Sequence, residues 1–443
     1  MRVNFRRAFI AFSALAFSAA HAASISVANS IAEMQSEPTT SAVQILSYYP
    51  GLGKGGGLFV WNATSSANPD GCVAFAGKSG SGRWIRQVSN TLDVTMCGAW
   101  WDNTHDDARA LDSAFKTAAA QRVTLALPGG TGKVCSTVQA VPGVIVRGEG
   151  MGVSGNIAAS PTLVNADCLK GGWVFETLGS NGTAQLEAPK YYDMSIKLGN
   201  NNNPGGCIRW NRMDGGFTDS AGSQNYMMHP HAERIHCEMQ NAKGNQQIGL
   251  QCSKCFDGDF SQNEIAWGKT GMDLEGSDVM CIGCAGPNRL WGSQDSLIKL
   301  ISSGTFGNMD RVVGNEILNP LDQGQRYDSF ILDNARSSTV EANHIEGAIK
   351  GVQSAIHLIG GFSHSIADND IDVVTEGTTP APHWLIGDGP FVNVRVFNNG
   401  VAGIVMGPAL FNGAASQPYY NDGGVHQIVT HGGNAVNGDA GFP

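Results

Sequence analysis

A repeat of about 26 residues is the feature that most restricts how this chain can fold. Asn, any residue and an apolar residue recur five times, with 25, 27, 28 and 26 residues between consecutive Asn residues. The copies are Asn263-Glu-Ile265, Asn288-Arg-Leu290, Asn315-Glu-Ile317, Asn343-His-Ile345 and Asn369-Asp-Ile371. A fixed period of this length indicates a solenoid, in which each repeat forms one coil and packs on its neighbours.

A second series of short apolar alternations runs in phase with the first. Its members are Ile248-Gly-Leu250, Met272-Asp-Leu274, Ile298-Lys-Leu300, Phe330-Ile-Leu332, Ile356-His-Leu358 and Trp384-Leu-Ile386. Such alternation is typical of a strand with one buried face. We therefore expect a parallel β-solenoid in which the Asn residues adopt left-handed turns and bond from coil to coil. A β-sandwich, the alternative, predicts turns every ~8–12 residues and no second series in phase.

One helix is expected before the solenoid. Thr104 and Asp107 form a T-x-x-D start signal, and apolar residues follow at helical spacing. These apolar residues are Leu111, Ala114, Phe115 and Ala118. Because the end coil of a solenoid exposes its core, we expect this helix to cap it. Residues 23–98 are expected to form a small β lead-in module, and residues 99–443 the solenoid domain.

The first 22 residues read as a secretory signal. Arg2, Arg6 and Arg7 precede an apolar run, and Ala20-His-Ala22 resembles a cleavage site. No run reaches the ~18 apolar residues that a membrane span needs. We expect a secreted protein, extracellular or periplasmic, without a membrane partner. Without the leader, 25 basic and 38 acidic residues leave a formal charge of −13, which argues against nucleic acid as a partner.

Ten cysteines in an exported chain predict disulfides. The pairs Cys72 with Cys97, Cys135 with Cys168 and Cys207 with Cys237 are plausible, although sequence does not determine connectivity. Two C-x-x-C motifs remain, Cys252 to Cys255 and Cys281 to Cys284. In a cytosolic protein they would indicate zinc, but export favours disulfides that link the two segments, so no metal site is predicted.

Three segments in order resemble the start of the pectate-lyase-like, right-handed parallel β-helix superfamily. They are Cys97-Gly-Ala-Trp-Trp-Asp-Asn-Thr-His-Asp-Asp-Ala-Arg-Ala-Leu-Asp112, Val123-Thr-Leu-Ala-Leu-Pro-Gly-Gly130 and Val144-Ile-Val-Arg-Gly-Glu-Gly150. Gly55-Gly-Gly-Leu-Phe-Val-Trp61 and Gly82-Arg-Trp-Ile-Arg86 resemble the lead-in module of phage tailspikes. The resemblance implies an all-β parallel β-helix. It implies no single reaction, because the superfamily contains lyases, glycosidases, epimerases and tailspike depolymerases.

The second series places titratable residues on one outer face. The residue between two inward apolar positions points outward, so Asp273, Lys299, Ile331 and His357 should form a column with a spacing of roughly 4.8 Å. Glu275 and Asp333 should lie in the adjacent column, two coils or about 9–10 Å apart. The predicted catalytic residues are Asp273, Glu275, Lys299, Asp333 and His357.

Two kinds of glycan cleavage suit this face. Elimination needs a cation beside the uronate carboxyl, supplied by Lys299, Arg326 or acid-bound Ca²⁺, and a base such as His357 or Tyr327. An inverting hydrolase needs two carboxyls roughly 6.5–9.5 Å apart, as expected for Glu275 with Asp333. The resemblance favours an endo-acting lyase on an acidic polysaccharide, although the chain lacks the Asn-Thr-Asp-Gly-type motif of polygalacturonases and the arginine-bearing motif of pectate lyases.

Substrate contacts are predicted for four further residues. Arg326 and Tyr327 precede an outer strand and should border the cleft, while Trp267 and Trp291 are candidate platforms for sugar rings. The alternatives are a glycan-binding solenoid without activity, a C5-epimerase, and charged residues that serve solubility alone. The prediction requires no cofactor, and a monomer and a homotrimer both suit the sequence.

Overall fold

The computed structural model describes most of the chain from residue 25 onward. It leaves undescribed residues 1–24, 37–40, 79, 154, 179–184, 200–201, 212–225, 243, 279, 303–309, 320–326, 334–336, 350–351, 362, 376–382, 389–394, 398, 403–409, 413–419, 422–425, 428–429, 432–434 and 437–443. The expected secretory leader lies outside the described residues.

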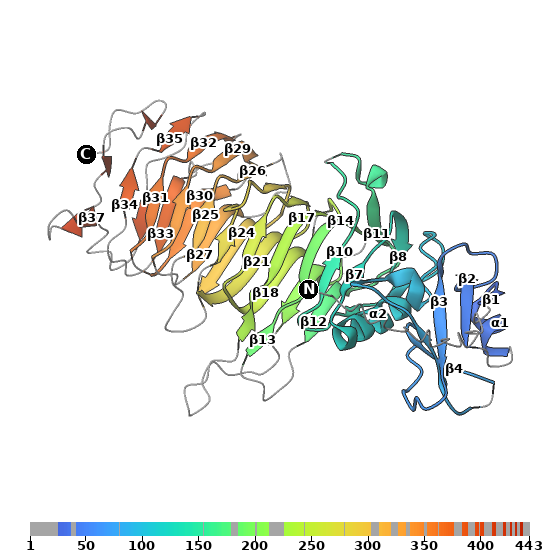
Figure 1. Cartoon of the computed structure of the whole chain (residues 1–443). Coiled ribbons are helices and arrows are strands. Elements are labelled where there is room, and N and C mark those ends of the chain that lie inside the picture. Colours follow the sequence, from blue (N-terminus) through green and yellow to red (C-terminus); the bar gives the residue numbers. More distant parts are fainter. Residues whose placement is uncertain are drawn as a thin grey trace, which may run out of the picture.

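A small module precedes the solenoid. It contains β1 (Ser26–Ala28), α1 (Ile31–Ser36), β2 (Ala42–Ser47), β3 (Gly55–Asn62), β4 (Ala74–Ala76) and β5 (Arg83–Arg86). The five strands form one sheet in the order β1-β2-β3-β5-β4. Its own core includes the buried side chains of Met34, Phe59 and Trp84. Figure 1 shows this module at one end of an elongated stack of strands.

The rest of the described chain forms two large sheets of stacked parallel strands. Sheet I has 12 strands. They are β9 (Val138–Gln139), β12 (Gly172–Leu178), β13 (Gln185–Glu187), β15 (Gly205–Asn211), β16 (Tyr226–Met228), β18 (Gln247–Phe256), β21 (Thr270–Asp278), β24 (Ser296–Ser302), β27 (Tyr327–Asp333), β30 (Val352–Ile359), β33 (His383–Asp388) and β36 (Leu410–Asn412).

Sheet II has 21 strands and closes the other sides of the coil. They are β6 (Thr91–Asp93), β7 (Thr124–Ala126), β8 (Gly130–Lys133), β10 (Ile145–Arg147), β11 (Thr162–Ala166), β14 (Lys190–Leu198), β17 (His231–Glu238), β19 (Asp259–Ser261), β20 (Glu264–Ala266), β22 (Cys281–Ile282), β23 (Arg289–Trp291), β25 (Arg311–Val313), β26 (Glu316–Asn319), β28 (Thr339–Glu341), β29 (His344–Ile349), β31 (Ser365–Ala367), β32 (Asp370–Thr375), β34 (Arg395–Phe397), β35 (Gly400–Ala402), β39 (Thr430–His431) and β40 (Ala435–Val436). Strands β37 (Tyr420–Asn421) and β38 (His426–Gln427) pair antiparallel apart from both sheets.

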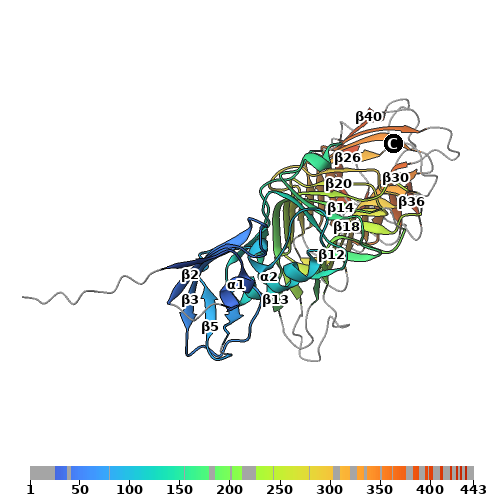
Figure 2. The same cartoon turned by 90° about the vertical axis from the view of Figure 1, so that its right-hand side faces the viewer.

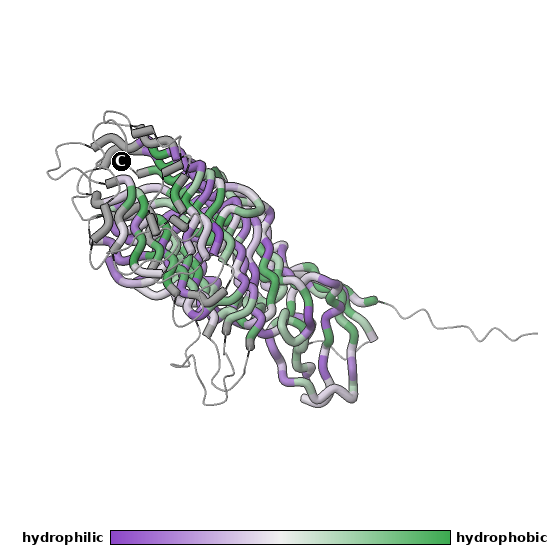
Figure 3. The backbone as a smooth tube through the Cα atoms, turned by 90° about the vertical axis from the view of Figure 1, so that its left-hand side faces the viewer, coloured by the Kyte–Doolittle hydropathy of each residue, from purple (hydrophilic) through white to green (hydrophobic). Residues whose placement is uncertain are grey.

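Each regular coil contributes one strand to sheet I and two to sheet II. Because β21 pairs in parallel with β24, and β20 with β23, each coil lies on the next over its whole circumference. The predicted all-β parallel β-helix is therefore confirmed. Figure 3 shows green and purple segments alternating along the stacked strands, as expected when successive side chains face the core and the solvent in turn.

The repeated Asn residues form the predicted ladder. The side-chain amide of Asn288 donates to Oδ1 of Asn315 at 2.8 Å, and that of Asn315 donates to Oδ1 of Asn343 at 2.9 Å. The same amide of Asn315 also donates to the carbonyl of Ile282 at 3.0 Å. One detail of the prediction is wrong: before four of the five Asn residues the left-handed residue is the preceding one, as at Ala342 with φ 54°, whereas Asn288 follows a proline. This placement leaves the Asn side chain inside the turn, where it replaces missing backbone partners.

The capping helix is also present. Helix α2 (Ala108–Gln121) buries Leu111 and Phe115 completely, and the Phe115 ring lies 6.0 Å from that of Phe175 in β12. Figure 2 shows α2 between the module and the first coils. The start signal differs from the prediction, because Asp107 occupies the N-cap position in place of Thr104. The Asp107 carboxylate accepts hydrogen bonds from the backbone N–H groups of Trp100 and Trp101.

All ten cysteines form disulfides. Cys72–Cys97, Cys135–Cys168 and Cys207–Cys237 pair as expected. The expectation of bridges between the two C-x-x-C segments is wrong, because the bonds run within each motif, Cys252–Cys255 and Cys281–Cys284. Cys252 and Cys255 belong to β18 of sheet I, whereas Cys281 begins β22 of sheet II, so the two motifs lie on different sides of the coil. Two short 3₁₀ turns, η1 (Val94–Cys97) and η2 (Ile157–Ala159), complete the described elements.

Candidate active site on sheet I

The predicted outward column exists on sheet I. Strand pairing places Asp273 of β21 opposite Lys299 of β24, Lys299 opposite Ile331 of β27, and Ile331 opposite His357 of β30. The flanking residues on these strands, such as Met272, Leu274, Ile298 and Leu300, are buried in the core. We call this series of paired positions the polar column; at Ile331 the structure describes the backbone alone.

The polar column continues toward the N-terminus over three residues that the sequence analysis missed. Gln251 pairs with Asp273, Arg209 with Gln251, and Glu176 with Arg209. The signal was present in part, because Ile208-Arg-Trp210 has the same alternation as the later strands, whereas Phe175-Glu-Thr177 ends on a polar residue. The period of the Asn repeat does not connect these two strands, because Glu176 and Arg209 are 33 positions apart in the sequence.

Two side-chain contacts order the N-terminal half of the column. The Arg209 guanidinium donates to Oε1 of Glu176 at 3.1 Å and lies over the Trp173 ring, 5.7 Å from its centre. The Gln251 amide donates to Oδ2 of Asp273 at 3.1 Å. Gln251 therefore holds one oxygen of the Asp273 carboxylate, and the other oxygen makes no hydrogen bond with a described residue.

Lys299 and Glu275 are the two ionisable groups of this face without a described partner. Both side chains are half-buried, and neither makes a hydrogen bond or ion pair with any residue the structure describes. Glu275 is the second outward residue of β21 after Asp273, and it pairs with Ile301, two residues beyond Lys299. Lys299 therefore lies opposite Asp273 and diagonal to Glu275, which places one cation beside two carboxylates.

The predicted second column is also in register. Glu275 pairs with Ile301, and Ile301 pairs with Asp333, so the two acidic residues lie two strands apart. For Tyr327 and Asp333, the first and last residues of β27, the structure describes the backbone alone. Arg326 lies outside the described residues.

The remaining predicted residues lie in less open positions. His357 is in the polar column but only 8% exposed, so it is the least accessible of the catalytic candidates that have described side chains. Trp267 and Trp291 lie where sheet II turns toward sheet I, and the Trp267 amide donates to the Trp291 carbonyl at 2.8 Å. The Trp267 ring packs against Gly292, where a Cβ added to the glycine would lie 2.2 Å from the ring. Neither tryptophan belongs to the polar column.

Sheet II carries a second row of charges, which the sequence analysis did not assemble. Glu264, Arg289, Glu316, His344 and Asp370 occupy successive paired positions. Arg289 donates to both carboxylate oxygens of Glu316, at 2.7 and 3.2 Å. His344 lies 2.9 Å from Glu346 and 3.1 Å from Asp370, and these hydrogen bonds raise the pKa of its imidazole. Arg289 and Glu316 satisfy each other, as do His344 and its two carboxylate partners, which suits a structural role.

The described donor groups do not suit a metal ion. No cluster of three or more His, Cys, Asp or Glu residues is arranged to hold one within the described ranges. His229 contacts Glu187, His231 contacts Glu233, and His236 faces the carbonyl of Gly152, so these three histidines do not converge. We therefore derive no step through the Ca²⁺ that the sequence left open.

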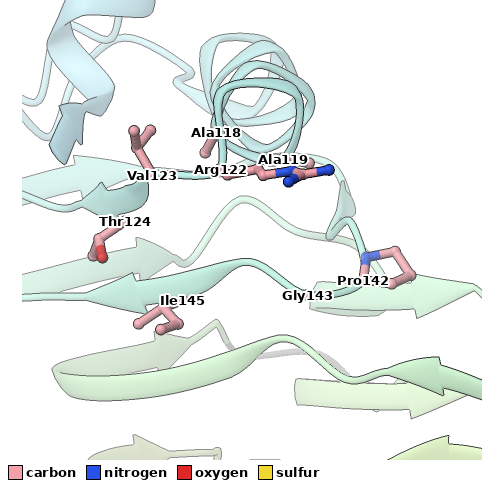
Figure 4. A pocket seen from close by; sticks show the side chains of 8 residues that line it. All are labelled: Ala118, Ala119, Arg122, Val123, Thr124, Pro142, Gly143 and Ile145. Carbon is pink, nitrogen blue, oxygen red and sulfur yellow. The ribbon is translucent and has the colours of Figure 1, made fainter. Parts of the chain in front are cut away.

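A pocket of about 320 Å³ lies beside the C-terminal end of α2, away from the polar column. Figure 4 shows Arg122 extending across it, with Ile145 and Pro142 on the facing strand and loop. Arg122 is its one charged lining residue. Within the described part of the chain, no helix has the length and apolar character needed to cross a membrane.

Comparison with known proteins supports the fold. The model of a phage tail protein small four-stranded β-sheet domain matches residues 27–89. No curated protein matches in sequence. The tailspike gp42 of Acinetobacter phage vb_AbaP_AS12 is 8% identical, with a TM-score of 0.56 over 95% of this chain and 78% of that one.

Two further structures align less closely. The enzymatically active domain of tailspike protein 4 from bacteriophage CBA120 is 12% identical, with a TM-score of 0.49 over 88% of this chain and 54% of that chain. This chain thus spans about half the length of that protein. The A-module of the Azotobacter vinelandii mannuronan C-5 epimerase AlgE6 is 14% identical, with a TM-score of 0.48, covering 79% of this chain and 99% of that one. The strand pairing and the alignment with the gp42 tailspike show the parallel β-helix fold of phage tailspikes, and the resemblance seen in the sequence is confirmed at that level.

Proposed function

We propose that this chain is an exported enzyme that hydrolyses a polysaccharide bound across sheet I. The observation that carries the proposal is the pair of outward carboxylates on β21, Asp273 and Glu275, with the Lys299 ammonium beside them. The Cα atoms of two residues that face the same side of a strand are about 6.6 Å apart, which allows their carboxyl groups to stand at the roughly 6.5–9.5 Å that inverting glycosidases use. The tailspike fold and the long polar column support a linear glycan as the substrate.

The two carboxyl groups have different surroundings, which suggests their roles. Asp273 is held by Gln251 through one oxygen, so its other oxygen is placed to take a proton from an attacking water. Glu275 has no described partner and is placed to give its proton to the glycosidic oxygen. In this step the bond from the anomeric carbon to that oxygen breaks while the water oxygen bonds to the same carbon. Lys299 would hold the substrate and the Asp273 carboxylate in place.

β-Elimination on an acidic glycan is the second candidate. It is favoured by the unpartnered ammonium of Lys299, which could neutralise a uronate carboxyl, and by His357 in the same column as a base. In elimination the proton α to the carboxyl leaves, the bond to the leaving oxygen breaks, and a carbon–carbon double bond forms. We rank elimination second because of the charges on the outer face of sheet I. Among the described residues of the polar column and Glu275 beside it, three are acidic (Glu176, Asp273 and Glu275) and two are basic (Arg209 and Lys299), which is unfavourable for a polyanion.

The distinguishing experiment is digestion of a panel of neutral and acidic exopolysaccharides by the purified chain, followed by viscosity. New reducing ends with inverted anomeric configuration, read by NMR, are expected for hydrolysis. Products that absorb in the unsaturated-uronate band would show elimination, and the proposed function would then be a lyase in place of a hydrolase. Binding without any loss of viscosity on every glycan that binds would favour a glycan-binding solenoid and end the enzyme proposal.

A further inference from the structure

A second pocket lies at the joint between the lead-in module and the solenoid, at the opposite end of α2 from the pocket of Figure 4. Its volume is about 440 Å³. The module supplies Tyr48, Tyr49 and Asp70, the following loop supplies Trp100, and α2 supplies Arg109 and Ser113. We call it the joint pocket. Its volume falls within the ~300–1,000 Å³ of sites for small ligands.

One wall of the joint pocket is a fixed stack of aromatic rings. The Tyr49 ring stacks on Trp100 at 4.6 Å with 11° between planes, and Trp100 stacks on His105 at 4.1 Å with 15°. Tyr48 meets Tyr49 edge-on at 4.8 Å. A Cβ at Gly98 would lie 2.9 Å from the Tyr48 ring and 3.1 Å from the Tyr49 hydroxyl, so the glycine allows both rings to approach. The wall is thus formed before any ligand arrives.

The polar groups of the pocket include donors that the protein does not use. The exposed Arg109 guanidinium and the hydroxyls of the half-buried Tyr49 and Ser113 make no hydrogen bond or ion pair with the residues described here. The acceptors are partly used. Asp70 accepts three backbone N–H groups through Oδ1, and Asp106 accepts those of Ala108 and Cys135 through its Oδ1. In both carboxylates Oδ2 has no described partner.

We propose that the joint pocket binds one neutral pyranose unit of a glycan. Each sugar hydroxyl both donates and accepts hydrogen bonds, and the pocket offers unused donors beside unused acceptors. Trp100 is already stacked on both Tyr49 and His105, so the half-buried rings of Tyr48 and Tyr49 are the aromatic surface left for the apolar C–H face of a pyranose. Two carboxylates beside one guanidinium disfavour an anionic sugar. The inference rests on the proposed function only in taking a glycan as the ligand.

The test is isothermal titration of the full chain with D-glucose, D-galactose and D-mannose, and with D-glucuronate as the charged comparator. Saturable binding of at least one neutral hexose, with a Kd near ~1 mM, is the expected result for a ligand of this size. Glucuronate should bind more weakly than that hexose. Arg109→Ala and Tyr49→Phe should each weaken binding, by about tenfold for Arg109→Ala, which removes a charged hydrogen bond.

Matched controls separate this site from sheet I and from misfolding. Lys116→Ala removes a cation from the exposed side of the same helix and should leave hexose affinity unchanged. Lys299→Ala alters sheet I and should also leave hexose affinity unchanged. Loss of polysaccharide cleavage and loss of hexose binding are then measured independently. Tyr49→Phe removes a single hydroxyl and keeps the aromatic stack. Absence of saturable binding by all three hexoses, tighter binding of glucuronate, or unchanged affinity in Arg109→Ala and Tyr49→Phe would each overturn the proposal.

Discussion

Asp273 and Lys299 face each other across adjacent strands of sheet I, although no ion pair within 4 Å joins their side chains. Gln251 holds the carboxylate of Asp273 by a hydrogen bond of 3.1 Å from the other side. The Asp273 carboxylate is therefore anchored and the Lys299 ammonium is not. A substrate that reaches the face meets an oriented carboxylate and an ammonium still able to form a contact.

Neutralising the carboxylates of β21 should abolish cleavage without unfolding the protein. Asp273→Asn and Glu275→Gln are each expected to reduce kcat by about 10²–10⁴, because each removes a group that transfers a proton. Asp372→Asn, an exposed carboxylate of sheet II, is the matched control and should keep full activity. The measurement is release of reducing ends from the polysaccharide identified by viscosity. Full activity in both β21 variants would show that the site lies elsewhere.

The Glu176–Arg209 pair should affect binding of long substrates more than the chemical step. These residues lie three and two strands before Asp273 in the polar column, so only an extended glycan would reach them. Arg209→Ala should raise KM on polymer by about tenfold, equivalent to one charged hydrogen bond, with kcat unchanged. Short oligosaccharides should show no such change. An equal effect on short and long substrates would contradict the extended groove.

Interrupting the Asn ladder should destabilise the solenoid. Asn315 is 1% exposed, donates to Asn343 and Ile282, and accepts from the side chain of Asn288. Asn315→Ala leaves these buried groups unpaired, and we expect a loss of about 2–4 kcal/mol in the free energy of unfolding. Asn202→Ala, at an exposed position, should change it by less than about 0.5 kcal/mol. Urea titration followed by circular dichroism measures both.

His364 should make the protein less stable in acid. It is 1% exposed, and burial lowers its pKa from 6.5 to about 4. Below pH 6.5 the unfolded chain takes up a proton that the folded chain does not, so stability falls as the pH decreases toward 4. Relative to pH 7.5, the wild type at pH 4.5 should lose about 2–3 kcal/mol more than His364→Leu. Equal losses in the two proteins would show that the pKa of His364 does not differ between the folded and the unfolded chain.

His344 should have the opposite dependence on pH. Hydrogen bonds to Glu346 and Asp370 raise its pKa above 6.5, and Glu316 occupies the paired position on the preceding strand. The protonated form is favoured in the folded chain, so its contribution is complete below pH 6.5 and is lost as the pH rises through the raised pKa. His344→Gln should therefore destabilise the protein more at pH 6 than at pH 9, by urea titration. A larger destabilisation by His344→Gln at pH 9 than at pH 6 would contradict a raised pKa of His344 in the folded chain.

Much of the architecture could be read from the period of the chain. Residues one repeat apart, such as Asn315 and Asn343 or Asp273 and Lys299, occupy equivalent positions on adjacent coils, because strands alternate their side chains and stack at a constant spacing. The sequence alone therefore determined the solenoid, the Asn ladder and the outward column.

Only the tertiary structure decided which of those residues have partners. Loops of unequal length disturb the period between Glu176, Arg209 and Asp273, so their alignment requires knowledge of strand pairing. Tyr49, Trp100 and Arg109 meet at the joint pocket through packing of the module against α2, and no local pattern encodes such a contact. The physical reason is that a repeat specifies contacts between equivalent positions, whereas contacts between unlike elements depend on how the whole chain closes upon itself.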